Sequence, residues 1–314
     1  MTFKTTDDKN LFLIPSNYFY KDVTRALTQS IEDFDQKTFE RAAKIAKYDD
    51  LTLKHGRYRI PQNASYFDLV RFLRSGAQEP VNVVINNVRT IDQLAGKTAA
   101  YLESDSIDFL SAFTDSQTLE ELGVNVQTLM TIFIPNTYQF LWTTRPEAFL
   151  KRMKSEHDKF WNTNDRIEKA KNLNLSPTEV YILASIVERE SQVQSERPTI
   201  AGLYLNRLRK NMRLQADPTV VFAMQDFTIK RVLNKHLVFE SPYNTYLYEG
   251  LPPGPICMAS INSIDAVLNA DEHYYLYMCA APDTSGKHVF AETLTQHNIN
   301  ANAYRRFLNK MGIR

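Results

Sequence analysis

One helix constrains the fold and chemistry of this chain more than any other stretch, and it is predicted over residues 176–191. Ser176 is a natural N-cap, Pro177 suits the first helical position, and Glu179 completes a capping box with Ser176. An apolar stripe at positions i, i+3, i+4 and i+7 follows, and it consists of Val180, Leu183, Ala184 and Val187. The stripe predicts that this helix packs into a hydrophobic core.

Glu190 and Ser191 occupy the next positions on the same stripe, so a carboxylate lies on or beside the buried face. Burying a carboxylate costs free energy unless it is paired or its raised pKa is used in chemistry. Two interpretations are therefore open: Glu190 forms a structural ion pair with an arginine such as Arg197, or it is a catalytic acid. Structural ion pairs are the commoner case, so the helix alone favours the first. Glu188 lies further round the helix, near its edge.

Composition excludes several classes of protein. The formal net charge of the 314 residues is +1, without the excess of basic residues typical of nucleic-acid binding. No metal or cofactor is expected, because the two cysteines, Cys257 and Cys279, lack metal-ligand spacing and no phosphate-binding loop is present. These cysteines form either one disulfide or two free thiols.

Membrane-spanning segments are not expected within this sequence. It contains no window of 18 or more apolar residues, and its N-terminus lacks the apolar core of a signal peptide. We therefore expect either a cytoplasmic protein or a soluble part of one whose membrane anchor lies outside this sequence.

The N-terminal part of the chain predicts a β-α-α-β unit. Residues 11–15 and 56–60 have the alternation typical of strands, and residues 20–30 and 36–46 have helical periodicity. A further amphipathic helix, capped by Ser65, follows the second strand.

The domain boundary is predicted beside an expected strand at 81–85. It separates a small module, residues 1–82, from a larger mixed α/β domain, residues 83–314, and the fold class is α+β. The patterns of the larger domain predict an edge strand or loop at 132–140, helices at 145–167, 260–268 and 293–311, and a buried strand at 274–279 paired with 288–290.

A stretch dense in turn residues contains S-P-Y-N-T-Y (241–246) and G-L-P-P-G-P (250–255). It is either only a rigid turn or the wall of a carbohydrate cleft, since rigid hydrogen-bonding groups and aromatic rings suit sugars. Asp217 either caps a helix or stands near Glu190 as a second carboxylate, which glycoside hydrolysis normally needs. His288 and His297 are expected to be structural.

Several motifs occur in an order typical of one enzyme family. They are I-P-N-T-Y-Q-F (134–140), L-A-S-I-V-E-R-E-S (183–191), S-E-R (195–197), L-N-R-L (205–208), L-Q-A-D-P-T-V (214–220), S-P-Y-N-T-Y (241–246), G-L-P-P-G-P-I (250–256), Y-L-Y (275–277), H-V-F (288–290) and L-T-Q-H-N (294–298). By these motifs the chain resembles the endolytic murein transglycosylases, the YceG-like family. The dense part of the resemblance covers about residues 130–310, and the 1–82 module is similar in plan to the LysM-like module of that family.

The resemblance implies a lyase that cleaves the β-1,4 bond between N-acetylmuramic acid and N-acetylglucosamine within peptidoglycan strands. The products end in 1,6-anhydro-muramic acid, and no cofactor is needed. The family's catalytic glutamate stands in an E-x-E-[ST] context, which matches Glu190 and agrees with its place on the helix. Asn206 and Arg207 are expected to brace the helix. The expected substrate-binding residues are Gln215, Asp217, Tyr243, Asn244, Thr245 and Tyr246.

The resemblance also implies a location outside the cytoplasm, on the periplasmic side, with an inner-membrane anchor formed by an N-terminal helix absent from this chain. Glycan strands are the expected partner, peptidoglycan synthases are implied as neighbours, and nucleic acid is not expected. Two alternatives stay open. One is a muramidase-type hydrolase that uses Asp217 as its second carboxylate, and the other is a non-catalytic peptidoglycan-binding or scaffold protein.

Overall fold

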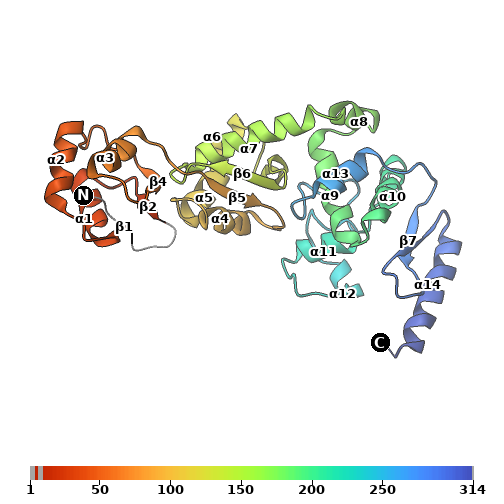
Figure 1. The fold of residues 1–314 in the computed structure, drawn as a ribbon. Helices are drawn as coiled ribbons and strands as arrows, with labels where there is room; N and C mark the ends of the chain where they lie inside the picture. Colours follow the sequence, from red (N-terminus) through yellow and green to blue (C-terminus); the bar gives the residue numbers. More distant parts are fainter. Residues whose placement is uncertain (1–3, 6–9, 313–314) are drawn as a thin grey trace. The chain divides into compact units, whose positions relative to one another are not determined.

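The computed structural model describes residues 4–5 and 10–312, and its N-terminal part contains the predicted β-α-α-β unit (Figure 1). Strand β2 (Leu11–Ile14) pairs antiparallel with β4 (Gly56–Arg59), and helices α1 (Tyr20–Ser30) and α2 (Gln36–Ala46) lie between them in the chain. The prediction of these four elements is confirmed. The further elements here are β1 (Lys4–Thr5), which pairs with β3 (Ile31–Glu32), and α3 (Tyr66–Ser75).

Local signals fix the ends of these helices. The Asp35 side chain accepts a hydrogen bond from the Thr38 N–H, and the Ser65 hydroxyl accepts one from the Asp68 N–H, so α2 and α3 each begin at a side-chain cap. Gly76 ends α3 with a φ of 72°, which glycine adopts without steric strain. The apolar faces of the helices then pack on the β2–β4 sheet around fully buried Tyr58.

The chain divides into two compact units, which do not follow one cut in the sequence. The first comprises the residues up to 84 with 95–110 and 137–149, and the second comprises 85–94, 111–136 and 150–314. The predicted domains 1–82 and 83–314 therefore stay a prediction. The elements of the middle of the chain are β5 (Val81–Ile85), α4 (Ile91–Ala99), α5 (Ser106–Thr114), α6 (Ser116–Glu121), the 3₁₀ helix η1 (Leu129–Ile132) and β6 (Asn136–Phe140), which pairs with β5.

The single charged helix predicted over 145–167 is wrong, since the stretch forms α7 (Pro146–Trp161) and α8 (Arg166–Asn172). The chain breaks at Asn164 and Asp165, whose φ angles of 59° and 55° lie in the left-handed region that Asn and Asp tolerate. After the break, the buried Arg166 guanidinium donates to the Asp265 carboxylate at 2.9 Å. This long-range contact is invisible to helical periodicity.

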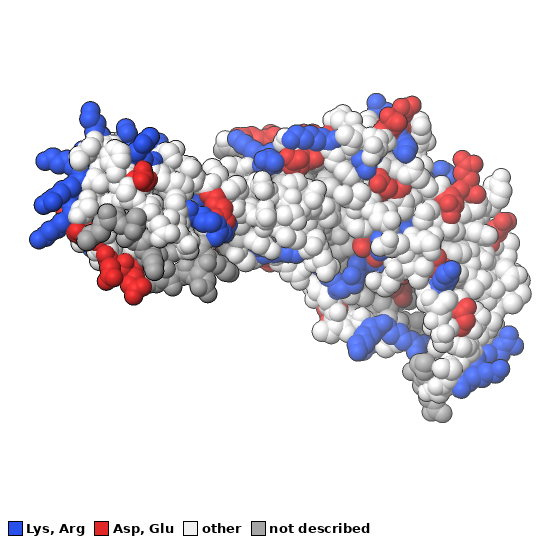
Figure 2. Space-filling model, viewed as in Figure 1, with Lys and Arg blue, Asp and Glu red and all other residues white. Residues whose placement is uncertain are grey.

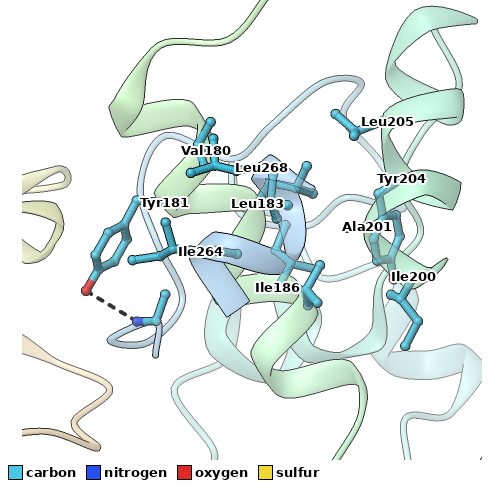
Figure 3. Packing of buried hydrophobic residues seen from close by; sticks show 14 of the residues in the cluster. Val180, Tyr181, Leu183, Ile186, Ile200, Ala201, Tyr204, Leu205, Ile264 and Leu268 are labelled. Carbon is cyan, nitrogen blue, oxygen red and sulfur yellow. Dashed lines mark hydrogen bonds between the residues drawn. The ribbon is translucent and has the colours of Figure 1, made fainter. Parts of the chain in front are cut away.

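Three helices form the core of the second unit: α9 (Pro177–Glu190), α10 (Arg197–Arg209) and α13 (Ile261–Leu268). Figure 3 shows their apolar side chains gathered together. The Tyr181 hydroxyl in this core donates to the Phe133 carbonyl at 2.9 Å and accepts from the Ala259 N–H at 3.3 Å, the bond dashed in Figure 3. The helix α9 is thus tied to two distant segments of the chain.

The predicted start and stripe of α9 are confirmed. The Ser176 hydroxyl accepts from the Glu179 N–H at 3.2 Å, and the Glu179 carboxylate accepts from the Ser176 N–H at 2.7 Å. The predicted stripe is fully buried and consists of Val180, Leu183, Ala184 and Val187. The end of α9 is therefore held in a fixed position relative to α10 and α13.

The C-terminal elements confirm the predicted hairpin and closing helix, with one correction. Strand β7 (Tyr277–Ala280) pairs antiparallel with β8 (His288–Ala291), and α14 (Leu294–Lys310) packs on both strands. β7 is half-buried, not buried as predicted, because it belongs to a sheet of only two strands. The remaining elements are η2 (Gln194–Glu196), α11 (Asp217–Ala223) and α12 (Asn234–Leu237). The described fold is thus mixed α+β, mostly helical, with small two-stranded sheets.

Two further findings concern membrane-spanning helices and the cysteines. Across residues 4–5 and 10–312, no helix has both the length and the apolar character needed to cross a membrane. Cys257 and Cys279 are free thiols, the first buried and the second half-buried, so the alternative of a disulfide is excluded.

Candidate active site

Glu190, the last residue of α9, lines a polar pocket of about 240 Å³. Residues from α10, the 214–217 turn, the 241–250 loop and the β7–β8 hairpin complete the pocket. They are Leu203, Tyr204, Arg207, Leu214, Gln215, Asp217, Tyr246, Met278, Cys279, Ala280 and His288. Segments far apart in the sequence therefore converge on one carboxyl group.

The carboxyl group of Glu190 is in an unusual electrostatic setting. Its Oε2 atom is buried and has no hydrogen-bond partner among the described residues, although the residue as a whole is partly exposed. Burial, and secondly the negative charge of Asp217, raise the pKa of Glu190 to about 7, against the opposing effects of Tyr204 and Arg207. A group with this pKa can both donate and accept a proton near neutral pH.

Glu188, two residues earlier, is held in a different way. Its carboxylate pairs with both Nη atoms of Arg197 at 3.1 and 3.2 Å, and it accepts hydrogen bonds from the hydroxyls of Ser260 and Ser263. Burial raises the pKa of Glu188, but these hydrogen bonds and the Arg197 charge outweigh it, so the pKa is lowered. Glu188 therefore forms a structural ion pair with Arg197, which is the role that the sequence left open for Glu190.

Three predicted substrate-binding residues lie with Glu190 in the pocket. Asp217, at the start of α11, accepts a hydrogen bond from the Tyr246 hydroxyl at 2.6 Å. Gln215 has a positive φ of 50°, and its backbone N–H donates to the Thr245 carbonyl at 3.0 Å. The 214–217 turn is thus fixed against the 241–250 loop, so their polar side chains face one space.

The other three predicted residues do not line this pocket. Asn244 is fully buried, and its amide donates to the carbonyls of Leu237 and Phe239. Thr245 is 2% exposed, and its hydroxyl accepts from the Ala216 N–H at 3.0 Å. Tyr243 packs its ring against Phe222 at 4.8 Å between centroids. Asn244 thus ties its own stretch of chain together, while Thr245 and Tyr243 hold the loop against the 216–222 segment.

Two residues of α10, Tyr204 and Arg207, line the pocket although the sequence did not place them there. Tyr204 is 1% exposed and interacts with Glu190, and burial raises the pKa of its hydroxyl, which stays protonated. Arg207, which was expected to brace the helix, donates to the carbonyls of Leu276 at 2.6 Å and Leu214 at 2.8 Å, and it also lines the pocket. Tyr204 and Arg207 stand three positions apart on α10 and therefore lie on one face of the helix. This spacing was the signal in the sequence that could have placed both in the pocket.

His288 lines the pocket from the β7–β8 hairpin and is bonded to Glu196 of η2. The Glu196 carboxylate accepts from the His288 N–H at 2.8 Å, and its second oxygen lies 3.3 Å from the Ser191 hydroxyl. The turn after α9 is therefore bonded to the start of β8. Within the part of the chain that the structure describes, no group of three or more His, Cys, Asp or Glu side chains is placed to hold a metal ion.

Known proteins similar to this chain were found by sequence and by structure. The chain is 37% identical over 188 residues, 59% of its length, to the endolytic murein transglycosylase of Bacillus subtilis (strain 168). It is 29% identical over 293 residues, 83% of its length, to the endolytic murein transglycosylase of Streptococcus pneumoniae serotype 2. These matches span 51% and 52% of the two relatives, so the chain spans about half the length of the curated relatives it matches.

A solved structure is similar over almost the whole fold. The crystal structure of a yceG-like protein from Listeria monocytogenes superposes with a TM-score of 0.61 at 28% identity, covering 92% of this chain and 98% of that chain. The model of the YceG-like family matches residues 12–303. The resemblance inferred from the motifs is thereby confirmed. The chain belongs to the YceG-like family.

Proposed function

We propose that this chain is an endolytic lytic transglycosylase that cleaves the β-1,4 bond between N-acetylmuramic acid and N-acetylglucosamine within peptidoglycan strands. One observation carries the proposal: the Glu190 carboxyl, whose Oε2 atom is buried without a hydrogen-bond partner among the described residues, lines a polar pocket, and burial raises its pKa to about 7. Relatives named endolytic murein transglycosylase support it.

In the proposed reaction Glu190 acts twice. Its protonated carboxyl donates a proton to the glycosidic oxygen as the bond from muramyl C1 to that oxygen breaks. The substrate's own N-acetyl group stabilises the positive charge at C1. The Glu190 carboxylate then accepts the proton of the muramyl C6 hydroxyl, whose oxygen bonds to C1. The acid is regenerated, no water is consumed, and the product ends in 1,6-anhydro-muramic acid.

The neighbours of Glu190 supply binding and positioning. Burial raises the pKa of the Tyr204 and Tyr246 hydroxyls, so both are neutral hydrogen-bond partners for the sugar at neutral pH. Gln215 and Asp217 are exposed on the pocket wall and suit contact with sugar hydroxyls. We assign Tyr243, Asn244 and Thr245 a positioning role, because their side chains already contact Phe222, Leu237 and Ala216.

A muramidase-type hydrolase is the second candidate, and one observation favours it. Asp217 lies close enough to Glu190 for its charge to raise the pKa of that group, as a second carboxylate would in hydrolysis. Its hydrogen bond with Tyr246 holds it in place but also uses one of its oxygens. A non-catalytic binding role does not account for the raised pKa of Glu190.

The setting of the protein follows from the same proposal. Peptidoglycan lies outside the cytoplasm, so we propose an extracytoplasmic, membrane-anchored protein with peptidoglycan synthases nearby. We also propose that the β-α-α-β unit together with α3 acts as a LysM-like module, that is, as a unit that binds glycan.

Product analysis over time tests the function. Purified glycan strands incubated with the protein are expected to shorten rapidly before disaccharides accumulate, and the new ends are expected to be 1,6-anhydro-muramic acid by mass spectrometry. Release of disaccharides from the first time point would contradict internal cleavage, and unchanged strands would favour the non-catalytic alternative.

The pH dependence is expected to report the Glu190 carboxyl directly. The protonated form is needed to start the reaction, so kcat/KM, which reports the free enzyme, should fall by about ten-fold between pH 6 and pH 8 for a pKa of about 7. Because the charge of Asp217 raises this pKa, Asp217→Asn should move the falling limb to lower pH. Glu249→Gln, at an exposed acid of the same loop, is the control and should not move it. An Asp217→Asn profile that superposes on the wild type would contradict the coupling.

A further inference from the structure

A second pocket, of about 400 Å³, shares Asp217 with the pocket of Glu190 and is strongly basic. Four cations line it, namely Arg89, Arg189, Lys230 and Arg231. Its other lining residues are Pro218, Val221, Phe222, Phe227, Ile229, Val232 and Ile256, so Asp217 is its one acidic wall residue. On the face seen in Figure 2, lysine and arginine side chains gather over the α11–α12 region. We call this pocket the basic pocket.

The cations of the basic pocket have no anionic partner in the described part of the chain. None of the four takes part in a salt bridge there, and Asp217 is engaged by the Tyr246 hydroxyl. Arg89 and Arg189 line the same pocket, and burial, and secondly the charge of Arg189, lower the pKa of Arg89, as expected for like charges that share a pocket. An anion entering between them relieves their repulsion.

The pocket is also fixed in shape. The Arg89 guanidinium lies over the ring of Phe227 at 4.7 Å, and the Arg89 N–H donates to the Gln93 side chain at 2.8 Å. The carbonyl of the preceding residue, Val88, accepts a hydrogen bond from the Met258 N–H at 2.9 Å, so the Arg89 segment is joined to the loop that follows Ile256. Cations on a rigid, partly apolar wall suit a carboxylate carried on a peptide.

The position of the basic pocket relative to the proposed cleavage site identifies the ligand. Arg189 and Glu190 are consecutive residues of α9, yet Arg189 lines the basic pocket and Glu190 lines the catalytic one. A glycan strand bound at Glu190 is itself neutral, apart from the peptide stems attached to its muramic acid rings. Those stems carry free carboxylates, and they project from the sugar beside the scissile bond.

We propose that the basic pocket binds the carboxylates of the peptide stem on the muramic acid ring next to the bond cleaved at Glu190. The inference rests on the proposed function, since it takes the glycan strand as the ligand of the neighbouring pocket. The basic pocket then selects strands that carry acidic stems over bare strands and over strands whose stem carboxylates are amidated.

Binding to the Glu190→Gln protein tests this without turnover. Three matched tetrasaccharides are titrated by calorimetry: one with free stem carboxylates, one with the same stems as carboxamides, and one without stems. We expect the first to bind about ten-fold more tightly than the second, as for a charge-assisted hydrogen bond. In Lys230→Gln/Arg231→Gln the preference should disappear. In Arg306→Gln/Lys310→Gln, which removes two exposed cations of α14, it should remain.

The outcomes separate this inference from the proposed function. Equal affinity for free and amidated stems, or a preference that survives Lys230→Gln/Arg231→Gln and Arg89→Gln, overturns the inference even if the wild type cleaves strands. The inference is also overturned if the protein prefers strands that end in a diphosphate at the reducing end but binds strands with free and amidated stems equally. Stem discrimination that depends on the four cations supports it even if no lyase products form.

Discussion

Replacing Glu190 by glutamine is expected to lower kcat for strand cleavage by about 1,000-fold and to leave the Kd for glycan strands nearly unchanged. Glutamine fills the same space at the end of α9, but it can neither donate the proton to the leaving oxygen nor accept one from the C6 hydroxyl. Both steps of the proposed reaction are lost together. Initial rates of new-end formation give kcat, and calorimetry with uncleaved strands gives Kd.

The pKa of Glu190 provides a check that the variant is folded. Because burial raises the pKa of Glu190 from its ordinary value of 4.5 to about 7, this carboxyl favours the folded state fully only below pH 4.5, and the contribution is lost as pH rises from there through 7. Glu190→Gln should therefore have a Tm at least equal to that of the wild type at pH 8. A Glu190→Gln protein that cleaves strands at a wild-type rate would remove Glu190 from the mechanism, and Glu188→Gln would then be tested in its place.

Arg197→Ala is expected to lower the free energy of unfolding by about 3 kcal/mol. The substitution removes a guanidinium that is 5% exposed and leaves the Glu188 carboxylate without its cationic partner. Removing one partner of a buried ion pair is strongly destabilising, because the remaining charge stays desolvated. The Arg197 side chain also donates to the Asn262 side chain, so the contact between α10 and α13 is weakened too.

Urea unfolding followed by circular dichroism measures this effect, with Arg209→Ala as the matched control. Arg209 is an exposed arginine of the same helix whose guanidinium donates to the Asn206 side chain at 3.2 Å. Its removal should change the stability by less than about 0.5 kcal/mol. An Arg197→Ala protein as stable as Arg209→Ala would contradict the structural role of the Glu188–Arg197 pair.

Elements whose ends carry local signals could be predicted from the sequence. The capping box of Ser176 with Glu179 and the apolar stripe of α9 both depend on neighbours within one helix, and both are present. The first two long helices, Tyr20–Ser30 and Gln36–Ala46, likewise follow their periodicity. The placement of Glu190 beside the buried face rested on this same local argument.

Features that depend on contacts distant in sequence could not be predicted. The break between α7 and α8 is joined to Asp265, 99 residues after Arg166. Asn244 has the chemistry of a sugar ligand, but its amide is used by two carbonyls of its own loop. The basic pocket brings Arg89 to Arg189 and to the 227–232 segment, and no spacing in the sequence signals that meeting.

The central claim is that Glu190 transfers protons within the glycan and that no water enters the product. Cleavage of peptidoglycan by the wild type in water enriched in heavy oxygen, followed by mass spectrometry of the new ends, tests it most directly. We predict anhydro ends that are one water lighter than hydrolysis products and carry no heavy oxygen. Full-mass reducing ends that carry the label would contradict the account and make Asp217 the second carboxylate of a hydrolase.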